Sequence, residues 1–121
     1  MPNTTATKTP PSNPNSSPRE IEADLLLQAA TRLEWVQRSW EARKMELGDA
    51  LLFNRKLWTD VLASITDADH SLPAEIRQSI ASLAQFVTHE TQSLLSDPRP
   101  ERLKPLIMIN HELADGLLGR A

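Results

Sequence analysis

The three histidines of the chain, His70, His89 and His111, are the side chains that could bind a metal ion or transfer a proton near neutral pH. One is expected in a turn and the others on two different helices, and none has a second ligand at a metal-binding spacing. His89 and His111 are each followed directly by a glutamate, which points away from its neighbour on a helix and cannot orient it as a base. Asp115, four residues after His111, is placed for a surface pair with it. These residues predict neither a metal site nor an acid–base centre.

Other reactive groups are missing from the sequence as well. The chain has no cysteine, which excludes thiolate nucleophiles, thiolate metal ligands and disulfides. No glycine-rich loop could cradle a phosphate, and no serine lies in a nucleophile elbow. Asp67 and Asp69 are arranged like the start of a calcium loop, but the residues required later in that loop do not match. We therefore predict a non-enzymatic protein with no cofactor and no metal ion.

Polar and aromatic side chains within the apolar pattern are more informative. Asn54 and Asn110 occupy positions inside the apolar stripes of two expected helices. A buried amide without partners costs about 1–3 kcal/mol, so the asparagines either bond to one another or to backbone and fix the register, or serve as polar anchors in a groove. Trp40 and Trp58 fit the inward stripes. Trp35 should lie at the edge of its helix, where it could anchor a partner or pack at a boundary.

The distribution of charges argues against nucleic acid as a partner, and the lengths of the apolar stretches argue against a membrane-spanning helix. The chain carries 13 Lys and Arg and 16 Asp and Glu, a net charge of −3, and the two signs alternate without a basic cluster. Direct contact with nucleic acid is therefore not expected. The longest apolar stretches, 25–27 and 106–109, are far shorter than the roughly 20 residues of a membrane-spanning helix. The N-terminus lacks the apolar segment of a signal peptide, so we predict a cytoplasmic protein.

The domain boundary is marked by a helix start. Residues 1–17 contain four of the nine prolines and almost no apolar side chain, which predicts a disordered tail. Ser17 can then cap a helix, with Pro18 at its first position and Glu20 at its third. Residues 18–121 form the expected folded domain.

Helical periodicity continues from this cap to the end of the chain. We expect the first helix to end near Glu46, because Gly48 followed by Asp49 is typical of a left-handed C-terminal stop. The second apolar stripe covers 51–65 and is followed by a polar turn at 67–71.

The third helix should have Pro73 at its first position and stop before Ser96. The last stripe covers 103–117, with a late start or a kink at Pro105. No segment alternates with a period of two. The prediction is an all-α fold, an antiparallel bundle of about four amphipathic helices with a disordered N-terminal tail.

Four segments of the sequence resemble a known family. They read REIEADLLLQAATRLEWVQ, ALLFNRKLWTDVL, LPAEIRQSIASLAQFV and ERLKPLIMINHELADGLLG, and the most specific strings within them are residues 54–58 and 72–77. From about Pro18 to Gly119 the chain is similar to the bacterial flagellar biosynthesis regulators called FlaF. Phe53, Asp60 and Pro105 depart from that family's usual residues.

The resemblance implies a cytoplasmic, non-enzymatic role in making flagellin available. It implies flagellin as partner, held as by a chaperone for synthesis or export, and the FlbT repressor as a second partner that the protein opposes. An amphipathic helix of flagellin could dock in an apolar groove. Residues expected to contact it are Asn54, Arg55, Trp58, Arg77 and Asn110.

Two other interpretations stay open at this point. One is a post-transcriptional regulator of flagellin messenger RNA that acts through another regulatory protein or RNA. The other is a homodimer whose additional apolar surface is its own interface.

Overall fold

The structure is a computed structural model that describes residues 17–65 and 72–120. These residues form four long helices and three short helical segments, and no strand is found among them. In chain order they are α1 (Pro18–Arg38), α2 (Trp40–Arg43), η2 (Lys44–Glu46), α3 (Leu47–Ile65), α4 (Ala74–Ser96), η3 (Pro100–Leu103) and α5 (Lys104–Leu117). The predicted all-α bundle of about four helices is confirmed. The predicted tail, apart from Ser17, and the predicted turn at 67–71 lie outside the described residues.

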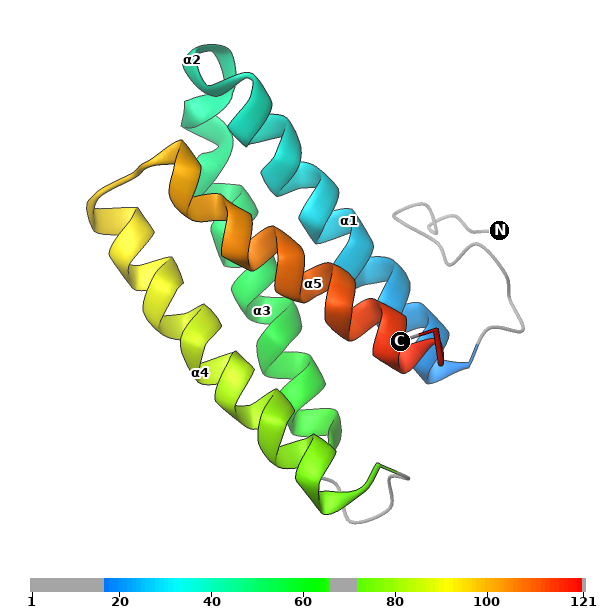
Figure 1. Cartoon of the computed structure of the whole chain (residues 1–121). Helices are drawn as coiled ribbons and strands as arrows, with labels where there is room; N and C mark the ends of the chain where they lie inside the picture. The colour runs from blue at the N-terminus through cyan, green and yellow to red at the C-terminus, as the bar shows by residue number, and fades with distance from the viewer. Residues whose placement is uncertain (1–16, 66–71, 121) are drawn as a thin grey trace, which may run out of the picture.

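The four long helices run alternately up and down (Figure 1). α1 packs against both α3 and α5, and α4 packs mainly against α3. α4 and α5 make few contacts with each other, and in Figure 1 they diverge from the connection that joins them. The bundle is therefore closed along three helix pairs and open along the fourth.

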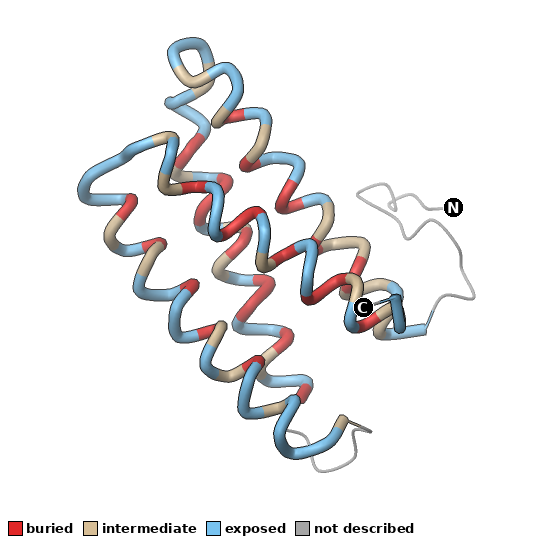
Figure 2. The backbone as a smooth tube through the Cα atoms, in the orientation of Figure 1, coloured by how far each residue is buried: buried red, intermediate tan, exposed pale blue. Residues whose placement is uncertain are grey.

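The core runs along the inward side of the long helices, where Figure 2 shows the buried positions as stripes. Leu26, Leu33, Leu51, Leu94 and Leu106 are each fully buried. Of the four long helices, α4 has the fewest buried residues for its length, because it packs mainly against α3. Burying each of these leucines stabilises the fold by about 1.5–3 kcal/mol.

The start of α1 has the predicted capping box. The Ser17 hydroxyl accepts a hydrogen bond from the Glu20 backbone N–H at 3.2 Å, and the Ser17 N–H donates to the Glu20 carboxylate at 2.9 Å. Pro18 occupies the first turn, where its missing N–H has no partner to lose.

The predicted end of the first helix is wrong. α1 ends at Arg38, Ser39 leaves the helical conformation with φ −117° and ψ 51°, and two short segments form a corner before α3 starts at Leu47. α2 and η2 have no buried residue, so the core does not hold a straight extension of α1. Gly48 lies in the first turn of α3, and Gly119 is the only described residue with a positive φ. Burial of Leu47 beside Gly48, and not the glycine, sets the start of α3.

Replacing Gly48 by alanine should raise the free energy of unfolding by about 0.4–1 kcal/mol, because alanine loses less chain entropy in a helix. A Cβ atom at this position would meet no heavy atom within 4 Å. The matched control is Gly119→Ala, where a φ of +74° makes a side chain costly by about 1 kcal/mol. Chemical denaturation followed by circular dichroism measures both changes. Destabilisation by Gly48→Ala would instead indicate the left-handed stop predicted from the sequence.

The prolines set the remaining boundaries. Pro73 is the N-cap of α4 and not its first residue, one position from the prediction. α4 stops at Ser96, one residue later than predicted. Pro105 lies in the first turn of α5, after the separate segment η3, so the late start is observed and no helical hydrogen bond is lost.

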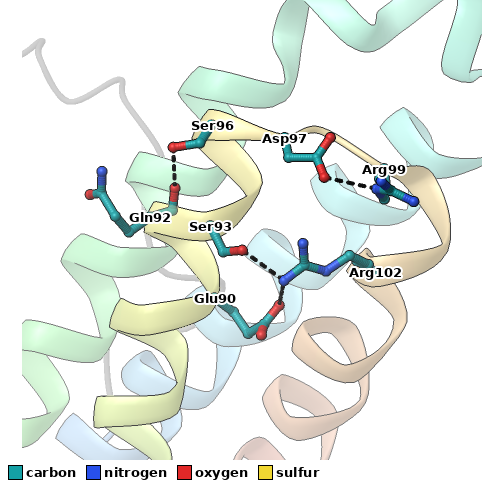
Figure 3. Close-up of polar contacts among 7 residues, drawn as sticks. All are labelled: Glu90, Gln92, Ser93, Ser96, Asp97, Arg99 and Arg102. Carbon is teal, nitrogen blue, oxygen red and sulfur yellow. Dashed lines mark hydrogen bonds and ion pairs between the residues drawn. The ribbon is translucent and has the colours of Figure 1, made fainter.

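The connection between α4 and α5 is held by Arg102 (Figure 3). Its guanidinium donates to the Glu90 carboxylate at 3.0 Å and to the Ser93 hydroxyl at 2.8 Å. Both members of the ion pair are partly buried, which protects it from solvent screening. On the other side, the Gln37 amide donates to the Pro100 carbonyl at 2.9 Å. η3 is thus fastened to both α4 and α1, which fixes the end at which α4 and α5 come together.

Candidate partner-binding site

Three of the five predicted site residues form a buried polar cluster. The Asn110 amide donates to the Asn54 side-chain oxygen at 2.7 Å and to the Leu26 carbonyl at 3.1 Å. The Asn110 side-chain oxygen accepts from the Trp58 indole N–H at 2.8 Å. Each of the three side chains is at most 1% exposed. The cluster joins α5 to α3 and α1, and this is the register-fixing arrangement weighed from the sequence.

The cluster is not fully satisfied. The Asn54 amide nitrogen and the Thr91 hydroxyl are buried without a hydrogen-bond partner in the described part of the chain. Asn54 lies on α3 and Thr91 on α4, the helix that packs against it. Each such group costs about 1–3 kcal/mol. The α3–α4 contact is therefore weaker than its apolar area alone would indicate.

Arg55 and Arg77 are not brought together. Arg55 is half-buried in the middle of α3. Arg77 is half-buried in the first turn of α4, and its guanidinium donates to the Leu72 carbonyl at 3.4 Å. This bond ties Arg77 to the start of its own helix. A role of either arginine in partner binding stays a prediction.

The three tryptophans differ in exposure. Trp58 is 1% exposed and lies beneath a shallow hollow of about 340 Å³ between α3 and α4. Trp40 is half-buried against the core. Trp35 is 54% exposed, as its position at the helix edge predicts, and the Arg43 guanidinium lies over its ring at 5.5 Å. Of the three, Trp35 has the most surface for a partner.

An opening lined mainly by apolar side chains lies where α4 and α5 diverge. We call it the α4–α5 groove, and its volume is about 540 Å³. Its apolar residues are Leu83, Phe86, Pro105, Met108 and Ile109. Its charged residues are Glu101, Lys104 and Glu112. Phe86 is 37% exposed and Met108 48% exposed, so the groove presents large apolar side chains to solvent.

A second, more polar hollow of about 610 Å³ lies between α1 and α5. There the His111 ring nitrogen Nε2 lies 3.7 Å from the Glu34 carboxylate. The expected pair between His111 and Asp115 is wrong, because Asp115 accepts from Arg120 at 3.0 Å instead. Glu34 lies on the neighbouring helix α1 and could not be inferred from spacing along one helix.

One carboxyl group has a shifted pKa. Burial raises the pKa of Glu22 above its ordinary value of 4.5. The Ser64 hydroxyl, which donates to the carboxylate, and the positive charge of Arg19 lower this pKa, whereas Asp60 raises it further. Because the folded pKa is the higher one, protonated Glu22 favours the folded state, and this contribution is lost as the pH rises through the folded pKa.

Replacing Glu22 by glutamine should therefore raise the free energy of unfolding at pH 7. The half-buried side chain is partly screened by solvent, so we expect a gain below about 1 kcal/mol. The difference from the unmodified protein should disappear below about pH 4, where Glu22 is protonated in both states. Urea denaturation at several pH values measures it, with the exposed Glu112→Gln as control. A gain that persists unchanged in acid would contradict the assigned cause.

Side-chain clustering and helix hydropathy in the described part of the chain bear on metal and membrane binding. No three His, Asp or Glu side chains there lie close enough together to hold a metal ion. Among residues 17–65 and 72–120, no helix is both long and apolar enough to cross a membrane. The α4–α5 groove offers a partner an apolar surface with charged residues beside it.

Comparison with known proteins identifies the family. The model of the family described as flagellar protein FlaF matches residues 9–117. The chain belongs to the FlaF family. No curated protein and no solved structure matches it.

The FlaF match covers the polar cluster, both arginines and the α4–α5 groove. It begins inside the predicted tail and ends with the last residue of α5. The groove was not found from the sequence, because the periodicity places Phe86 on the flank of its stripe and Met108 outside the stripe of its helix. The sequence signal that could have indicated the groove is the presence of large apolar residues, Phe86 and Met108, outside the buried stripes of two helices.

Proposed function

We propose that this FlaF-family chain is a non-enzymatic regulator of flagellar biosynthesis that binds flagellin. It acts as a chaperone in the cytoplasm, promotes flagellin synthesis or export, and opposes the FlbT repressor. The family match supports the flagellar assignment. The finer role rests on the chemistry of the surface.

The observation that carries this proposal is the apolar surface left open between α4 and α5. A small domain gains nothing in stability by exposing Phe86 and Met108, and exposed apolar patches mark interaction sites. The resemblance to FlaF implies flagellin as the partner, with terminal helices that must be kept from assembling early. A bundle with an open side can cover one such helix by helix-in-groove docking.

The experiment is to titrate purified protein into monomeric flagellin at physiological salt by calorimetry, with light scattering on the mixture. We expect a one-to-one complex with a negative heat-capacity change, the sign of apolar burial. Flagellin without its terminal helices should not bind. FlbT in place of flagellin tests the second partner.

If the protein and flagellin did not bind at concentrations on the order of tens of micromolar, the chaperone function would be contradicted. Light scattering of the protein alone shows whether it is a monomer or a homodimer. If the protein were a dimer that dissociates when flagellin binds, flagellin and the second copy of the chain would bind to the same apolar surface. A dimer that binds no flagellin would support the homodimer interpretation instead.

A further inference from the structure

We infer that the docking site for flagellin is the α4–α5 groove, and that it takes a single amphipathic helix of about three turns with complementary charges at its ends. This inference rests on the proposed function. It moves the binding surface away from the buried cluster of Asn54, Trp58 and Asn110, whose side chains are at most 1% exposed.

The length of the guest follows from the lining of α5 and η3. The lining residues recur every three or four positions, the spacing of one helix face: Glu101, Lys104, Pro105, Met108, Ile109 and Glu112. The α-helical part from Lys104 to Glu112 is about 12 Å long at 1.5 Å per residue, and the 3-10 turn that begins at Glu101 adds about 6 Å at 2 Å per residue. A helix of about three turns lying along this face would be in contact over its whole length.

The composition of the groove selects an amphipathic guest. Its middle is apolar, with Phe86 on one wall and Met108 and Ile109 on the other. The charged residues lie at its two ends, Glu101 and Lys104 at the η3 end and Glu112 at the other. A guest that buries an apolar stripe of about two turns between charged residues meets both kinds of surface.

The charges at the ends also specify the guest. Glu101, Lys104 and Glu112 are exposed, and within residues 17–65 and 72–120 none of them belongs to an ion pair. Their signs along the groove are negative, positive and negative. The complementary helix has a basic residue at each end of its stripe and an acidic residue about one turn inside the end that faces η3. Because this pattern is not symmetric, it fixes the direction in which the guest lies.

The groove is held open at a fixed width near η3. The Arg102 guanidinium bonds to Glu90 and Ser93 on α4 and so joins the first wall to the second (Figure 3). A groove whose walls are already fastened loses little conformational freedom when a helix enters. The groove has eight lining residues, fewer than the roughly 20–30 that each partner contributes to a stable dimer interface, so its size suits a single helix better than a second copy of this chain.

The test compares two exposed apolar residues of similar exposure. Met108, in the groove, is 48% exposed, and Leu52, on α3 and not part of the groove lining, is 42% exposed. Met108→Asp should weaken binding of full-length flagellin at least about 30-fold, the effect of a contact hot spot, whereas Leu52→Asp should change it less than about 3-fold. Neither side chain is buried, so both variants should unfold at nearly the same denaturant concentration as the unmodified protein.

A second pair of variants tests the charges. Glu112→Lys should weaken binding about 5- to 10-fold at low salt and less as salt is added. Glu75→Lys, an exposed charge reversal in the first turn of α4, is the control. Reversal of the basic residue at the matching end of the flagellin helix should restore binding to Glu112→Lys.

The outcomes separate this inference from the proposed function. If the unmodified protein binds flagellin and Met108→Asp binds it equally well, the groove is excluded as the site while flagellin binding stands. If Met108→Asp and Leu52→Asp weaken binding alike, the contact is not specific to the groove and the inference fails. If the unmodified protein does not bind flagellin, the proposed function fails and this inference fails with it.

Discussion

Replacing Asn110 by leucine should lower the free energy of unfolding by about 2–5 kcal/mol. The substitution keeps the approximate size of the side chain but removes the group at the centre of the polar cluster. The Trp58 indole N–H and the Asn54 side-chain oxygen both lose their partner at once. The free energy of unfolding of such domains is about 5–15 kcal/mol. The variant should therefore be only marginally stable.

Asn54→Leu is the matched control, and its expected cost is below about 1 kcal/mol. The amide nitrogen of Asn54 has no partner in the described part of the chain, so removing it relieves a penalty. Asn110 loses one acceptor but keeps its bond to the Leu26 carbonyl. Urea denaturation followed by circular dichroism gives both values. Equal costs for the two substitutions would show that Asn110 is not the centre of the cluster.

The sequence predicts those parts of the fold that depend on local chemistry. The capping box at Ser17 needs only a serine, a proline and a glutamate in order, and the structure has it. Asn54 and Asn110 stand out because each interrupts an apolar stripe, and the structure buries both. The end of α4 is predicted to within one residue, because Asp97 and Pro98 are turn residues. In each case the decisive contacts lie within a few residues or along one helix face.

Other features depend on which helices become neighbours, and periodicity does not contain that information. The break at Ser39 accompanies full burial of Leu47, whereas α2 and η2, the two segments before it, have no fully buried residue. The partner of His111 is Glu34, which is 77 residues away in the sequence (111 − 34) and close only because α1 packs against α5. The α4–α5 groove exists because α4 packs mainly against α3 and makes few contacts with α5. Each of these features required the spatial order of the helices.

Trp58→Ala should lower the free energy of unfolding by about 3–5 kcal/mol, the cost of emptying a large buried site. Trp58 is the largest fully buried side chain of the described residues, and its indole N–H also bonds to Asn110. The same substitution at Trp35, which is 54% exposed, should cost less than about 1 kcal/mol, including the loss of its contact with Arg43. Far-UV circular dichroism during denaturation measures both, because it does not depend on tryptophan emission. Similar costs at the two positions would contradict the burial of Trp58.

Trp58→Phe then separates folding from partner binding at this position. Phenylalanine keeps most of the buried ring and loses the hydrogen bond to Asn110, at a cost of about 1–2 kcal/mol. The variant should remain folded and should bind flagellin with unchanged affinity, because the docking site inferred here is the α4–α5 groove. A loss of affinity in a variant that is still fully folded would place Trp58 at the binding surface, as the sequence predicts. That result would require a movement that uncovers the indole when flagellin binds, since Trp58 is 1% exposed in this structure.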